Sequence, residues 1–293
     1  DSYGSRGLGD VYKRQVKAAE HGAIASVFRS LSSSTYDDFP HTGGMSYKEG
    51  LDSIPHGGLG VLSSEKLSQA LKNNPDLNLT VKLSGTWYPD APSHNVIGLI
   101  RGQKNPEKII TVGGHLDSWD IGEGAHDDGA GCVHSIGALR LFQKQNIKPN
   151  NTIRAVMFMN EEFGLRGGLK YAEIAVKEGE QHIAAIESDA SGYVPRGFGF
   201  SGSEEQYNKI QDWLKYFDKN TISYFSKGGG GADIGPLHRQ TGTPMFGLSI
   251  DGQKYFEMHH TAKDVFELVH ARELELGTAS MASLVYLIDK YGL

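Results

Sequence analysis

The feature that most constrains the fold of this 293-residue chain is a set of short, almost continuous apolar runs separated by helical stretches. Runs of this kind are typical of strands buried on both faces of a parallel sheet. Strands are predicted at residues 95–101, 108–114, 152–159, 182–188 and 243–249. The alternation of strands and helices predicts an α/β fold, in which a mainly parallel mixed sheet is sandwiched by helices.

Several of the remaining stretches have apolar residues at the spacing of an α-helix. Apolar side chains recur at helical spacing at Cys132, Ile136, Leu139 and Phe142, and again at Met281, Leu284, Val285 and Ile288. We expect each of these stripes to face the sheet. A helix is also predicted at 16–25, and another that is capped by Ser63 or Ser64 and stopped by Asn73-Asn74-Pro75.

The chain is expected to contain one large domain and part of another. Residues 1–15 show no periodicity and resemble translated adapter sequence, so they are interpreted as a non-native segment. Residues 16–92 are turn-rich and are interpreted as the remnant of a smaller, inserted domain, whereas 93–293 form the α/β part. The natural chain is therefore expected to enter near Val16 as an N-terminally truncated fragment.

Composition excludes several classes of function. A net charge of −6, with 38% hydrophobic and 22% charged residues, is unlike a disordered or nucleic-acid-binding protein. No apolar stretch reaches the roughly 18 residues that a membrane-spanning helix needs. Cys132 is the single cysteine, so the chain has no intramolecular disulfide and no multi-cysteine zinc site. A metal would have to be held by His, Asp and Glu.

Charged and imidazole side chains follow three successive predicted strands. His115 and Asp117 come after the second strand, Glu161 and Glu162 after the third, and Asp189 after the fourth. Ligands of such sheets collect beyond the carboxyl ends of the strands. Gathering these charges is expensive unless a cation neutralises them. Imidazole and carboxylate ligands suit zinc or, less selectively, manganese or cobalt.

Each motif also has an ordinary structural explanation. The pair of His115 and Asp117 could be a hydrogen-bonded turn, and Glu161-Glu162 could lie on a solvated face or in the acidic first turn of a helix. Asp127-Asp128 before Gly129 is typical of a turn that leads into a helix. Their joint occurrence at consecutive strand ends is what indicates a metal site.

The segments GHLDSWDIGEGAHDDGAG, NEEFGLRGG, ESDASG and HHTAKD together resemble the co-catalytic di-zinc aminopeptidase family. The similarity extends from about Val16 to the C-terminus. It implies the zinc-exopeptidase fold, with a peptidase domain at 93–293 and part of an inserted, protease-associated-like domain at 16–92. It also implies two zinc ions per chain.

Carried over to matching positions, the resemblance assigns the metal ligands. His115 and Asp189 would hold one zinc ion, and Glu162 and His260 the other. Asp127 would bridge both ions, and its peptide bond to the next residue would be cis.

Further roles follow for residues around these ligands. Glu161 would be the general base, and Asp117 would orient His115 by accepting its ring N–H. Tyr255 could hydrogen-bond the oxyanion, or simply be a packed aromatic residue, and His126 could line the substrate pocket. Asp264 would either orient His260 or cap the following helix.

The expected activity is hydrolysis of dipeptides or short peptides with a free N-terminus. A single-zinc glutaminyl cyclase-like enzyme and a non-catalytic, receptor-like relative are the alternatives, and the complete ligand set favours the peptidase over both. The resemblance also implies a homodimer and a secreted or periplasmic location, whose signal peptide would lie upstream of this fragment.

Overall fold

The structure is a computed structural model that describes residues 14–34, 36–45, 47–86, 88–218 and 221–293. Residues 1–13 of the segment interpreted as non-native lie outside this part, whereas Arg14 and Gln15 begin helix α2 (Arg14–Glu20). The described chain divides into two compact units. The first contains the residues up to Pro92 together with Trp119–Gly122 and Phe256–Asp264; the second contains Ser93–Ser118, Glu123–Tyr255 and Val265–Leu293.

The first unit contains a pair of short parallel strands, β1 (Ser26–Arg29) and β2 (His56–Leu59), and helix α3 (Val61–Asn73). The helix predicted at 16–25 is shorter, because Gly22 turns the chain with φ 81° before β1 begins. The predicted serine cap of α3 is wrong. Its N-cap is Gly60, and the Ser63 N–H donates instead to the Asp38 carboxylate at 2.8 Å. The helix ends at Asn73, as the Asn-Asn-Pro stop predicts.

The second unit is built on a seven-stranded sheet with the order β3-β5-β4-β6-β9-β7-β8. The bounds are β3 (Val96–Ile100), β4 (Asn105–His115), β5 (Asn151–Phe158), β6 (Gln181–Glu187), β7 (Pro195–Ser201), β8 (Tyr224–Lys227) and β9 (Met245–Ile250). Strands β5, β4, β6 and β9 are parallel, whereas β3 and β7 pair antiparallel with their neighbours β5 and β9. The predicted mixed, mainly parallel sheet is confirmed, as are all five predicted strands.

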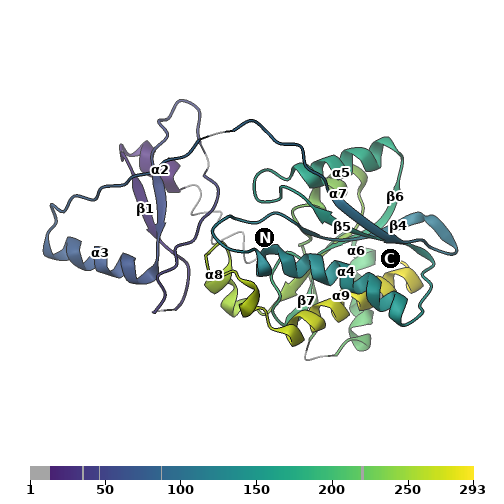
Figure 1. Ribbon diagram of the computed structural model, residues 1–293. Helices are drawn as coiled ribbons and strands as arrows, with labels where there is room; N and C mark the ends of the chain where they lie inside the picture. The colour runs from purple at the N-terminus through teal and green to yellow at the C-terminus, as the bar shows by residue number, and fades with distance from the viewer. Residues whose placement is uncertain (1–13, 35, 46, 87, 219–220) are drawn as a thin grey trace. The chain divides into compact units, whose positions relative to one another are not determined.

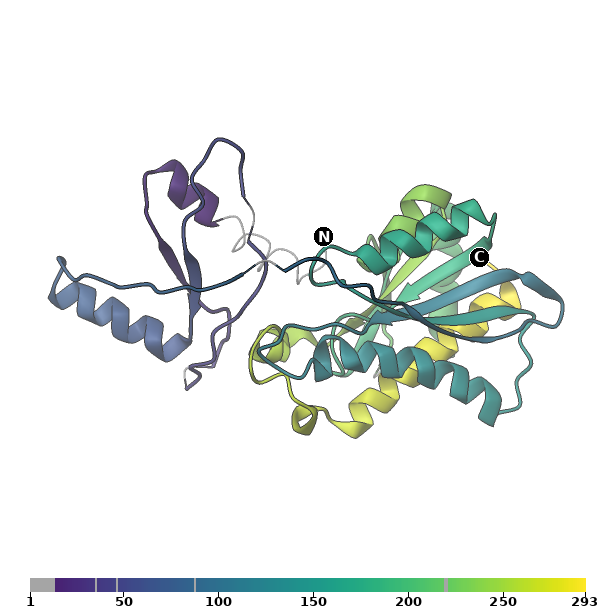
Figure 2. The ribbon, with the colours of Figure 1, turned by 45° about the horizontal axis from the view of Figure 1, so that its top comes forward.

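Helices cover both faces of this sheet. They are α4 (Ala130–Lys144), α5 (Arg166–Lys177), α6 (Glu204–Gln211), α7 (Gly235–Thr241) and α9 (Ala271–Tyr291), with α8 (Tyr255–Met258) across the boundary of the units. Short single turns are η1 (Ala125–Gly129), η2 (Asp212–Tyr216), η3 (Gly252–Lys254) and η4 (Phe266–Leu268). Helices α4 and α9 lie on one face and α5 and α7 on the other (Figures 1 and 2). No helix in the described ranges is long and apolar enough to cross a membrane.

Alternation along the strands explains the two layers of core. Val112 of β4 packs in the cluster that includes α4 and α9, whereas Val156 and Phe158 of β5 pack in the cluster that includes α5 and α7. The predicted stripe on α9 is buried throughout. On α4 the stripe is correct except for Ile136, which is 48% exposed. The parallel strands are therefore packed on both faces, and their carboxyl ends share one edge of the sheet.

Candidate metal centre

His115 is the last residue of β4, and its side chain is 1% exposed. The ring Nδ1 lies 2.8 Å from the main-chain carbonyl oxygen of Asp117. A carbonyl oxygen only accepts hydrogen bonds, so Nδ1 carries the proton and donates it. The other ring nitrogen, Nε2, then faces the Oδ1 atoms of Asp127 and Asp189, each at 3.2 Å. The tautomer thus leaves Nε2 and two carboxylates turned toward one point.

The charges around this point favour a cation. Burial by itself would lower the pKa of His115, but the carboxylates of Asp127 and Asp189 outweigh burial and raise that pKa well above its ordinary value. One ligand atom from each of these three residues lies within 4.8 Å of the others. Imidazole nitrogen and carboxylate oxygen are ordinary zinc ligands.

Glu161 and Glu162 lie in the turn that follows β5, and the carboxylate of Asp117 holds that turn. It accepts the main-chain N–H of Glu161 at 3.0 Å and that of Glu162 at 3.2 Å. Its Oδ1 is 3.8 Å from His115 Nδ1, so the main-chain carbonyl of Asp117 orients the imidazole while its carboxylate orients the two glutamates. Glu161, Glu162 and His115 each bring one ligand atom within 4.8 Å of the others.

Several carboxyl groups near His115 are hard to ionise in the absence of a cation. Burial, followed by the charge of Asp189, raises the pKa of Glu161 to about 8. Burial also raises the pKa of Asp128 well above its ordinary value, against the opposing effect of His115. A bound divalent cation would offset this accumulation of negative charge. The charge balance and the types of ligand atom therefore both fit zinc.

Asp127 and Asp128 are joined by a cis peptide bond, as the resemblance implied. The buried carboxylate of Asp128 accepts the main-chain N–H of His115 at 3.0 Å and that of Gly131 at 2.9 Å. A Cβ atom on Gly131 would collide with the Ser188 carbonyl and with the Asp128 carboxylate. Asp128 therefore ties the end of β4 to the start of α4, a role that the sequence did not reveal.

Two further acidic residues lie buried in the second unit, and sequence reasoning missed both. The carboxylate of Glu187, the last residue of β6, accepts the N–H of Asp233 at 3.4 Å and that of Ile234 at 2.8 Å. Gly231 leaves room for it, since a Cβ atom there would collide with the Glu187 carboxyl group. Burial is the main cause that raises the pKa of Glu187 to about 7 and that of Asp233 to about 9. The only sequence signals were the ESDASG segment and the glycine run at 228–231.

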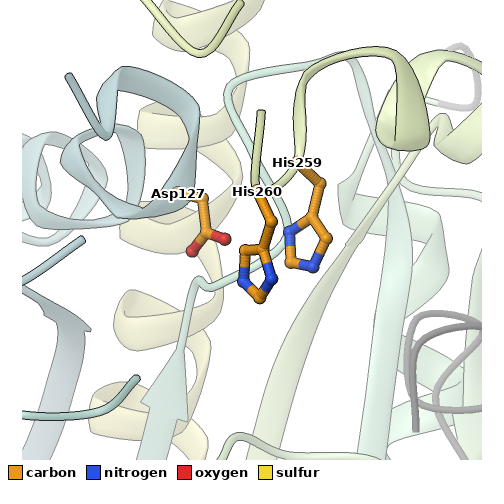
Figure 3. A group of neighbouring side chains, drawn as sticks. All are labelled: Asp127, His259 and His260. Carbon is orange, nitrogen blue, oxygen red and sulfur yellow. The ribbon is translucent and has the colours of Figure 1, made fainter. Parts of the chain in front are cut away.

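His260 lies in the segment of the first unit that follows α8. Figure 3 shows it with His259, and also shows Asp127 beside α4. The rings of His259 and His260 stack with their centroids 3.7 Å apart, and the His260 carbonyl accepts the Thr42 N–H at 2.8 Å. Asp264 is buried in the same segment, and its N–H donates to the Thr261 carbonyl at 3.1 Å. The ligand role of His260 and the orienting role of Asp264 stay predictions.

Ion pairs and hydrogen bonds fix this segment within the first unit. Glu257 accepts the hydroxyl hydrogens of Ser32 at 2.8 Å and Ser33 at 2.6 Å. Lys263 forms an ion pair of 2.9 Å with the buried Asp37. The backbone that presents His260 is therefore anchored on both sides.

The two remaining site predictions have different surroundings. Burial of the Tyr255 hydroxyl, followed by the charge of Asp127, raises the pKa of that phenol well above its ordinary value. A neutral phenol can donate a hydrogen bond, and the oxyanion role of Tyr255 stays a prediction. His126 is 1% exposed, and its ring contacts Ser191, Gly192 and Leu268. Its role in lining a substrate pocket also stays a prediction.

Known proteins share both the sequence and the fold. Residues 95–285 match peptidase family M28. The chain is 33% identical over 274 residues to carboxypeptidase Q of Bos taurus and to that of Homo sapiens. The aligned residues make up 93% of this chain and 57% of each relative. The chain belongs to peptidase family M28. The predicted family is confirmed, and within it the chain is similar to carboxypeptidase Q.

Several solved structures share the fold. The peptidase M28 precursor of Shewanella amazonensis superposes with a TM-score of 0.83 at 30% identity, over 96% of this chain and 63% of that chain. A zinc aminopeptidase of Bacillus subtilis has a TM-score of 0.62 at 20% identity, over 94% of this chain and 66% of that one. A glutaminyl cyclase of an Acidobacteriales bacterium has a TM-score of 0.52 at 16% identity, over 68% of this chain and 74% of that one. The last two show the fold alone, and this M28 chain spans little more than half the length of its carboxypeptidase Q relatives.

Proposed function

We propose that the protein is a di-zinc metallo-exopeptidase that hydrolyses dipeptides or short peptides with a free N-terminus. The observation that carries the proposal is the convergence of Asp127 Oδ1 and Asp189 Oδ1 on His115 Nε2, each at 3.2 Å, at the carboxyl edge of the sheet. His115 and Asp189 would hold one zinc ion, Glu162 and His260 the other, and Asp127 both. When bound, zinc supplies Lewis acidity, which polarises a peptide carbonyl and acidifies an attacking water.

Glu161 is the residue of this chain that would move the proton. Its carboxylate would take a proton from the attacking water while the water oxygen bonds to the peptide carbon. It would then give that proton to the amine nitrogen as the carbon–nitrogen bond breaks. The turn after β5 is suited to this task, because Asp117 fixes the N–H groups of both Glu161 and Glu162. One glutamate can then bind metal while its neighbour stays available as a base.

Hydrolysis of a dipeptide panel by the zinc-loaded protein tests the proposal, with Glu161→Gln as the inactive variant. The Gln side chain keeps the size of Glu161 but cannot accept the proton, so hydrolysis should fall by about 10²–10⁴-fold while zinc content is unchanged. Undiminished hydrolysis by Glu161→Gln would contradict the proposed base. An N-terminal Gln peptide in the same panel distinguishes a glutaminyl cyclase, which would release ammonia without hydrolysing a peptide bond.

A secreted or periplasmic location and a homodimer are also proposed. The family resemblance supports both. Size-exclusion chromatography with light scattering tests the second.

A further inference from the structure

His126 immediately precedes the proposed bridging ligand Asp127, and its ring is enclosed by other segments of the second unit. Nδ1 lies 2.7 Å from the Ser191 hydroxyl and 3.3 Å from the Gly192 main-chain nitrogen. Nε2 lies 3.3 Å from the Leu268 carbonyl oxygen. A main-chain N–H only donates, so Nδ1 accepts, and the ring proton lies on Nε2 and is donated to Leu268. In this neutral tautomer the Ser191 hydroxyl also donates to Nδ1.

The loop that His126 contacts is the loop that carries Asp189. Ser191 has φ 94°, in the left-handed region that residues with a Cβ atom rarely adopt. Such a conformation persists only where the surroundings hold it. The next residues are held by the same ring, since Gly192 donates to Nδ1 and Tyr193 stacks on the imidazole with centroids 4.7 Å apart. Three consecutive residues of this loop therefore contact one side chain.

We propose that His126 is a positioning residue that sets the separation of Asp127 and Asp189 before the metal binds. Its backbone leads directly into Asp127, and its ring fixes the loop that begins with Asp189. The two like-charged carboxylates repel each other, and this connection opposes their separation. With it, both face His115 Nε2 at 3.2 Å. The inference rests on the proposed zinc-binding function and goes beyond it, because it assigns the spacing of the ligands to a residue that is not itself a ligand.

Zinc affinity of the purified protein tests the proposal, measured by competition with a chromophoric chelator. His126→Leu keeps a side chain of similar bulk but removes both ring nitrogens, and should weaken zinc binding by about 10–100-fold, the usual effect of losing a partner behind the ligands. His126→Asn places a side-chain oxygen near the position of Nδ1 and should recover most of that loss. His238→Leu is the matched control, because His238 lies in α7 and its Nδ1 donates to the Thr243 carbonyl at 2.7 Å.

The affinity measurements are made at a temperature where circular dichroism shows each metal-free variant to be folded. A purely structural role of His126 would lower the melting temperature of the variant without changing the zinc affinity of its folded form. If His126→Leu is not folded, Ser191→Ala takes its place, since it removes only the hydroxyl donor to Nδ1; it too should weaken zinc binding. Wild-type zinc affinity in the folded variant, or an Asn variant as weak as the Leu variant, would overturn the proposal. Absence of zinc binding by the wild-type protein would instead refute the proposed function, and the role of His126 with it.

Discussion

Replacing Asp117 by Asn changes the support of the proposed base without changing the size of the side chain. The carboxylate of Asp117 accepts the N–H groups of Glu161 and Glu162 at 3.0 and 3.2 Å. An amide offers one oxygen and one NH₂ group, so one of these N–H groups would face another donor. The turn after β5 would lose one charge-assisted hydrogen bond, and Glu161 would lose its fixed position.

The size of the effect follows from that one bond. A hydrogen bond to a charged group contributes about 1.5–3 kcal/mol. If this stabilisation is lost in the transition state, kcat should fall by roughly 10–150-fold, at about 1.4 kcal/mol per factor of ten. Zinc content should be unchanged, because His115 Nδ1 donates to the main-chain carbonyl of Asp117, which the substitution keeps.

Dipeptide hydrolysis and zinc content, measured on the same preparations, check this prediction. Asp212→Asn is the matched control, since Asp212 is exposed in η2. Wild-type kcat in Asp117→Asn would refute the reasoning, because the carboxylate would then have no role in fixing Glu161. Loss of zinc would refute it differently, by showing that the carboxylate is needed to hold the ligands His115 or Glu162 in place.

Three further predictions concern stability and packing. Hydrogen bonds from Arg154 lower the pKa of Glu180 from 4.5 to about 2. The ion pair of Arg154 and Glu180 should therefore stabilise the fold above pH 4.5 and lose its effect as the pH falls through about 2. Acid titration of wild type and Glu180→Gln by circular dichroism should show a difference of about 1–2 kcal/mol at neutral pH that vanishes in strong acid. Gly131→Ala should abolish zinc binding or folding, because the new Cβ atom would collide with Ser188 and Asp128. Zinc competition and circular dichroism would show this loss. Phe158→Ala, at a fully buried position of β5, should cost about 3–5 kcal/mol in urea unfolding.

The parallel strands were predictable because burial on both faces makes their sequences almost uniformly apolar. Strand β7 was missed because its sequence, PRGFGFS, contains Gly and Pro, which are unfavourable in strands and here allow close approach. A Cβ atom on Gly199 would approach the Gly228 carbonyl. Ile136 was misplaced because helical spacing identifies an apolar stripe but not the extent of the sheet that it covers.

The residues around the proposed metals were only partly predictable. The position of His115 and Asp189 directly after strands made their proximity foreseeable. By contrast, the carboxylates of Asp128 and Glu187 accept main-chain N–H groups that the tertiary fold brings to them, and the local sequence does not show these partners. The sequence also suggested that the Asp117 carboxylate accepts the His115 ring proton. The position of the main-chain carbonyl, at 2.8 Å, follows from how the chain turns after β4.

Anomalous diffraction at the zinc edge, from crystals of the zinc-loaded protein, would locate the proposed metal ions directly. Zinc held by these ligands would give an anomalous peak within about 2.0–2.2 Å of His115 Nε2 and of carboxylate oxygens of Asp127 and Asp189, and the peak would be lost in His115→Ala. A second peak beside Glu162 would support the proposed pair of ions. No peak at His115, or an unchanged peak in His115→Ala, would contradict the account.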